Sequence, residues 1–134
     1  MSIRHRLAAA CLGALLIAGC KPDTTPPDRV FAQPGVVFTL SPPQAPDCHP
    51  DTVYKATVAW SITGQPERRL EVRVGSRGGA EFLRTSQARG REETGEWVRP
   101  GTWFLLVDRR SKEVLATLRA GPEPCPGGEA SEEE

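Results

Sequence analysis

Apolar and polar residues alternate with a period of two through most of positions 35–120, which is the pattern of β-strands with one buried face. The longest run lies between Thr52 and Thr63, and a weaker one covers Ala80 to Thr85. The clearest apolar positions are Val36, Phe38 and Leu40; Tyr54, Ala56, Val58, Trp60 and Ile62; Leu70, Val72 and Val74; and Val114, Ala116 and Leu118. In the run at 70–74, Glu71 and Arg73 are expected to face solvent.

Turn-forming residues interrupt these runs about every eight to fifteen positions. Gly64-Gln65-Pro66 and Gly78-Gly79 separate two pairs of strands, and Arg99-Pro100-Gly101 precedes a strand over Thr102–Val107, where proline fixes φ and Gly101 can adopt a positive φ. The charged residues around Glu92-Glu93 are expected to form a solvated loop. About seven short strands and no long helix predict an all-β, two-sheet sandwich.

Two short patches carry a family resemblance. Val58-Ala59-Trp60 and the later run Trp97-Val98-Arg99-Pro100-Gly101-Thr102-Trp103-Phe104 resemble the fibronectin type III pattern of an early-strand tryptophan and a Pro-Gly-Thr-x-aromatic entry into a central strand. The resemblance implies an immunoglobulin-like sandwich over 35–125 that serves as a spacer or interaction module. Phe104 stands where the family usually has tyrosine, and no Arg-Gly-Asp tripeptide is present, so adhesion through that motif is not implied.

The first nineteen residues have the layout of a signal peptide, with basic Arg4 and Arg6 before an apolar run from Leu7 to Gly19. Thirteen residues fall short of the roughly 20 that a membrane-spanning helix needs. We therefore expect residues 1–19 to be removed on export.

Ile17-Ala18-Gly19-Cys20 resembles the bacterial lipobox, which implies cleavage before Cys20 and a diacylglycerol on its thiol. The alternative is an ordinary secretory signal with a chance cysteine. Lys21 stands where an aspartate retains Gram-negative lipoproteins at the inner membrane, so the resemblance favours the outer membrane, facing the periplasm. The proline-rich stretch 20–34 is predicted to be a semi-rigid tether.

Besides Cys20, two cysteines remain in the exported chain, Cys48 and Cys125, and exported proteins meet oxidising conditions. We predict a disulfide between them. The alternative is a metal site built from Asp47, Cys48, His49 and Asp51 with Cys125, but its spacing fits no standard zinc framework. We therefore expect no metal and no cofactor.

Catalytic chemistry has little support in the sequence. His49 is the single histidine after the signal peptide, no serine lies in a nucleophile-elbow motif, and no phosphate-binding glycine loop leads into a helix. The chain is expected not to be an enzyme.

A binding surface is suggested by the strand over Thr102–Val107, in which both faces are largely apolar. The alternatives are an exposed aromatic patch for a polymer or protein partner, or cover by the tether or by arginine side chains. Arginines are frequent in the surrounding sequence, and their planar guanidinium groups can bind carboxylates and phosphates. A solvated arginine-rich face is the simpler interpretation. The candidate surface residues are Trp97, Trp103, Arg73, Arg84 and Arg99.

The formal charge of the whole chain is zero, with 17 basic and 17 acidic residues. Without residues 1–19 the count is 15 against 17, and it divides into +3 over 35–120 and −5 over 121–134. A charge of +3 is too small for a nucleic-acid footprint, so no nucleic-acid partner is expected. Residues 126–134 are predicted to be a solvated acidic tail.

These features predict a lipid-anchored, non-catalytic envelope protein with an interaction or structural role. One alternative is a binder of envelope polysaccharide or another polymer through the Trp and Arg surface. A metal-binding lipoprotein is a more distant alternative.

Overall fold

The fold was obtained as a computed structural model, which describes residues 23–122. These residues form no helix, as predicted, and eight strands, where the period-two pattern predicted about seven. The strands are β1 Phe31–Ala32, β2 Val36–Ser41, β3 Thr57–Ile62, β4 Glu67–Val74, β5 Ala80–Gln87, β6 Arg89–Glu93, β7 Trp103–Asp108 and β8 Val114–Arg119.

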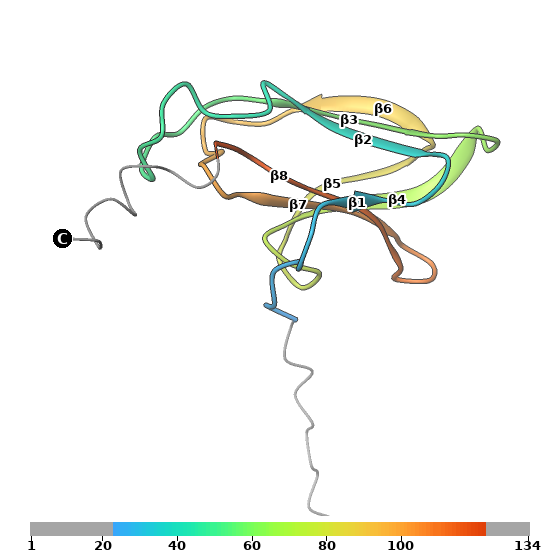
Figure 1. Cartoon of the computed structure of the whole chain (residues 1–134). Helices are drawn as coiled ribbons and strands as arrows, with labels where there is room; N and C mark the ends of the chain where they lie inside the picture. The colour runs from blue at the N-terminus through green and yellow to red at the C-terminus, as the bar shows by residue number, and fades with distance from the viewer. Residues whose placement is uncertain (1–22, 123–134) are drawn as a thin grey trace, which may run out of the picture.

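The strands form two antiparallel sheets that lie one above the other (Figure 1). Sheet A has the order β1-β8-β7-β4-β5, and sheet B has the order β2-β3-β6. The predicted two-sheet sandwich is therefore confirmed.

The core lies between the sheets and is built from the alternating positions. In β2 and β3, Val36, Leu40, Val58 and Trp60 are buried, and the register pairs Leu40 with Val58. Leu70 and Val72 of sheet A are fully buried opposite them. At about 25 cal/mol per Å² of apolar surface, this burial is the main term that favours folding.

The turn before β7 has the predicted geometry, since Gly101 has a φ of 90°. The Thr102 N–H donates to the Arg99 carbonyl oxygen at 3.0 Å and closes the turn. Trp97 and Val98 do not extend β7, because Val98 makes only an isolated bridge to Tyr54.

Strand β6 corrects the prediction of a loop around Glu92-Glu93. It pairs with β3 over five residues and forms an edge of sheet B. Its sequence holds no large apolar residue. Gly90 lies opposite Trp60, and Glu92 lies opposite Val58. Pairing with β3 therefore creates this strand, whereas its own side chains carry no strand pattern.

Candidate functional site

Strand β7 is apolar on both faces, and its outer face is covered. Phe104 and Leu106 point into the core, so Leu105 and Val107 point to the outer side of sheet A. Leu105 is nevertheless only 2% exposed and Val107 only 3%. Something in the chain therefore lies over this face.

Over Leu105, part of the cover comes from the proline-rich segment, residues 23–30. It runs beneath sheet A (Figure 1). Pro26 and Pro27 line a groove of about 290 Å³ together with Leu105. The Gly78 N–H in the β4–β5 turn donates to the Asp23 carbonyl oxygen at 2.8 Å. Of the two alternatives for the outer face, cover by the chain itself is the one found.

The same segment is fixed to β8 at its other end. The Thr117 hydroxyl donates to the Arg29 carbonyl oxygen at 2.6 Å and accepts from the Phe31 N–H at 3.2 Å. Strand β1 then pairs with β8. The described part of the predicted tether is therefore packed on the domain, because its backbone groups find partners in β8 and the β4–β5 turn.

The two candidate tryptophans lie on different sides of sheet A. Trp97 is 38% exposed and packs against Phe82 and Phe104, with ring centroids 5.8 Å and 5.9 Å apart. Because Phe104 points into the core, Trp97 closes an edge of the core. The Trp103 side chain points to the outer side of sheet A, and the Arg119 guanidinium lies 5.5 Å from its ring centroid.

Arg73 and Arg84 face outward as predicted, but both are paired with carboxylates. Arg73 Nη2 lies 3.0 Å from Glu71 Oε2, and Arg84 Nε lies 2.8 Å from Glu81 Oε1. Glu71 was expected to face solvent, yet it is 3% exposed because these neighbours surround it on the outer face. The hydrogen bond from Arg84 holds the pKa of Glu81 below its ordinary value.

The five candidate surface residues therefore do not form one surface. Arg73 and Arg84 share a charge-balanced network with Glu71 and Glu81. Arg99 lies exposed in the turn before β7, where its backbone N–H donates to the Thr102 hydroxyl at 3.0 Å.

Cys48 lies in the loop after β2, as predicted, and is a half-cystine. Cys125 lies outside the described residues, so their pairing stays a prediction. A backbone contact supports it, because Gln44 and Gly121 form a parallel bridge and the Ala45 N–H donates to the Gly121 carbonyl oxygen at 2.8 Å. Each bridged residue precedes its cysteine by four positions.

The acidic and histidine side chains of this loop make contacts within it. Asp47 accepts hydrogen bonds from the Thr52 hydroxyl at 2.6 Å and the His49 N–H at 2.9 Å, and both lower its pKa. His49 Nδ1 accepts from the Asp51 N–H at 3.1 Å. Across residues 23–122, no group of three His, Cys, Asp or Glu side chains is arranged to hold a metal ion.

A further groove, lined by three arginines, was not singled out from the sequence. It has a volume of about 570 Å³ and lies where β4 begins, beside the end of β5 and the β7–β8 turn. Its lining residues are Gln65, Glu67, Arg68, Arg69, Ser86, Asp108 and Arg110. The neighbouring pairs Arg68-Arg69 and Arg109-Arg110 were the available signal, but only the fold shows that they meet.

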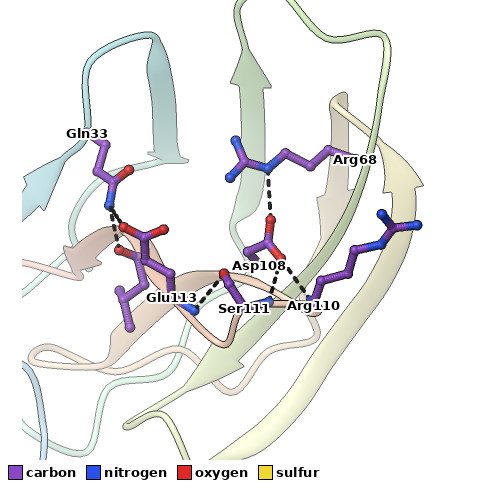
Figure 2. Close-up of polar contacts among 7 residues, drawn as sticks. Gln33, Arg68, Asp108, Arg110, Ser111 and Glu113 are labelled. Atoms are coloured by element: carbon purple, nitrogen blue, oxygen red, sulfur yellow. Dashed lines mark hydrogen bonds and ion pairs between the residues drawn. The ribbon is translucent and has the colours of Figure 1, made fainter.

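Asp108 organises this groove, as Figure 2 shows. One carboxylate oxygen accepts from Arg68 Nε at 2.9 Å, and the other accepts from the N–H groups of Arg110 at 2.8 Å and Ser111 at 3.0 Å. Burial raises the pKa of Asp108, but these hydrogen bonds outweigh burial and hold the pKa below its ordinary value.

The predicted signal peptide 1–19, the predicted lipidation site Cys20 and the predicted acidic tail 126–134 fall outside the described residues. Within residues 23–122, no helix reaches membrane-spanning length and apolarity. Comparison with protein-family models, with curated proteins and with solved structures finds no match to the chain.

Proposed function

We propose that this chain is a lipid-anchored cell-envelope protein whose β-sandwich is a non-catalytic interaction or structural module. The anchor is the thiol of Cys20, in the lipobox-like run Ile17-Ala18-Gly19-Cys20. Acyl chains contribute about 0.8 kcal/mol per buried methylene, so a triacylated cysteine holds a protein on a bilayer without an apolar span. Lys21 favours the outer membrane for this protein.

The observation that carries the proposal is this lipobox-like run, and the docking of the segment that follows Cys20 bears on how an anchored domain would be oriented. The backbone carbonyl oxygen of Asp23 accepts a hydrogen bond from the Gly78 N–H in the β4–β5 turn. Three residues reach at most about 10 Å, so the lipid on Cys20 would lie close to that turn. The domain would therefore be held against the bilayer by its outer sheet-A side.

The strand order supports an immunoglobulin-like module. If the two-residue β1 is set aside, the first, second and fifth strands (β2, β3 and β6) form one sheet. The third, sixth and seventh strands (β4, β7 and β8) form the other, with β5 at its edge. Immunoglobulin-type sandwiches divide their strands in this way.

Replacing the anchor tests the proposal. In cells that express the full chain, the native protein is expected in the membrane fraction, resistant to high salt and extracted by detergent. Cys20→Ala is expected to lose incorporation of labelled palmitate and tight membrane association. Cys11→Ala, in the middle of the apolar run, is the matched control and should behave as the native chain. Membrane-bound, palmitate-labelled Cys20→Ala protein would refute the proposal.

A second candidate is binding of an envelope polysaccharide, favoured by the exposed ring of Trp97 with Arg99 two residues beyond it. Soluble cell-wall or outer-membrane polysaccharide is then expected to change the tryptophan fluorescence. Trp97→Phe should keep the packing against Phe82 and Phe104 but reduce that change. If the polysaccharides leave the tryptophan fluorescence of the native protein unchanged, this function is excluded.

A further inference from the structure

The groove around Arg68 has the size of a small-ligand site. Its volume of about 570 Å³ falls within the roughly 300–1,000 Å³ that is typical of such pockets. It lies at the end of the sandwich where β4 begins and the β7–β8 turn closes. Three of its lining residues are arginines, so its chemistry favours an anion.

Arg68 is a fixed donor in this groove. Its side chain is 25% exposed, and its Nε donates to Asp108, whose side chain is 12% exposed. Figure 2 shows the two terminal nitrogens of Arg68 lying beyond this contact, away from the carboxylate. A guanidinium held through Nε keeps its planar fork oriented, which lowers the cost of binding a second oxyanion.

Both carboxylate oxygens of Asp108 already accept hydrogen bonds within the protein, from Arg68, Arg110 and Ser111. Glu67 is the remaining carboxylate that lines the groove, and it is exposed. Arg69 and Arg110 are also exposed, and within the described residues neither side chain makes an ion pair. The groove thus carries more cationic donors than the fold itself uses.

Backbone contacts bring these arginines to one place. The Arg109 N–H donates to the Arg69 carbonyl oxygen at 3.0 Å, which joins the start of β4 to the β7–β8 turn. Arg69 and Arg110 both line the groove, and so does Ser86, whose side chain carries a hydroxyl.

We propose that this groove binds a phosphate group, with Arg68 as the fixed ligand and Arg69 and Arg110 as adaptable ligands. Arginine forks bind phosphate oxygens through paired, charge-assisted hydrogen bonds, and several forks suit phosphate better than a carboxylate with two oxygens. The phosphate can belong to a lipid headgroup or to a soluble phosphate, since both present the same oxygens.

Calorimetric titration tests the site on the full chain, purified from membranes in a non-ionic detergent. Inorganic phosphate and glycerophosphoglycerol, the soluble headgroup of phosphatidylglycerol, are titrated at constant ionic strength. Saturable binding of either ligand is expected. Tighter binding of the diester assigns the site to a lipid headgroup, and tighter binding of inorganic phosphate assigns it to a soluble ligand.

Variants separate the groove from general charge effects. Arg69→Gln with Arg110→Gln is expected to weaken binding by about tenfold or more, because two charge-assisted donors are lost. Arg89→Gln with Arg91→Gln removes the same charge from the exposed β6 strand and should leave the affinity unchanged. Unchanged circular dichroism establishes that each variant is folded. The proposal is wrong if neither ligand binds saturably, or if both variant pairs weaken binding equally.

Discussion

Gly90 lies directly against the indole ring of Trp60 in sheet B. They are opposite each other in the β3–β6 pair, and the indole N–H of Trp60 donates to the Gln87 carbonyl oxygen at 3.0 Å. A Cβ at position 90 would lie 2.5 Å from Cζ2 of the indole. The Trp60 side chain is held by its hydrogen bond to Gln87, so position 90 requires glycine to leave space for the indole.

Gly90→Ala is therefore expected to lower the free energy of unfolding by about 1–3 kcal/mol, the usual cost of overpacking. Urea denaturation measures the change. Arg89→Ala, on the same strand with an exposed side chain, is the control and should change stability by less than about 0.5 kcal/mol. Equal stability of Gly90→Ala and the native protein would show that the indole does not pack as described.

Asp108 gives the protein an acid-sensitive contact. Its lowered pKa favours the ionised form in the folded state, so its contribution is complete above the unfolded-state pKa of about 3.9 and is lost as the pH falls through the folded-state value. Asp108→Asn is expected to cost about 1.5–3 kcal/mol near neutral pH, because hydrogen bonds to a charge are lost.

Urea denaturation of Asp108→Asn and the native protein at about pH 7 and about pH 3 checks this. The stability difference between them should shrink at the lower pH. Asp51→Asn, at an exposed carboxylate, should show little difference at either pH. A difference for Asp108→Asn that is the same at both pH values would contradict the assigned role.

At the level of strands, the alternating apolar residues were sufficient to predict β2, β3, β4 and β8, although β4 and β8 are buried on both faces. Strand β6 and the packing of residues 23–30 were not predictable in this way. Both depend on contacts with residues distant in the sequence, and the prolines by themselves indicate only an extended chain. The ion pairs of Arg73 with Glu71 and of Arg84 with Glu81 each lie within one strand, and the alignment of β4 with β5 places the two pairs side by side.

Thr117 tests the packing of the N-terminal segment, since its hydroxyl bonds to both Arg29 and Phe31. Thr117→Val keeps the side-chain shape and removes both hydrogen bonds. Faster hydrogen exchange at the Phe31 amide and a loss of about 1–2 kcal/mol in unfolding free energy are expected. Thr39→Val, exposed on the outer side of sheet B, is the control. Unchanged exchange at Phe31 would mean that the segment is held by other contacts.

At the level of the whole molecule, the predicted Cys48–Cys125 disulfide would close a loop of about 78 residues, worth roughly 4–5 kcal/mol in the chain-entropy model. Peptide mass spectrometry without reductant should recover the two cysteines in one linked peptide. Denaturation after reduction should show a large loss of stability. Free alkylation of both thiols in the unreduced protein would exclude the bond.

The proposed lipid anchor would determine where the sandwich, its docked N-terminal segment and the arginine groove act. Mass spectrometry of the N-terminal peptide from membrane-purified protein tests it most directly. We predict a peptide that begins at Cys20, lacks residues 1–19 and carries a diacylglyceryl thioether and an acylated amine. An unmodified Cys20, or a peptide that still carries residues 1–19, would contradict the account.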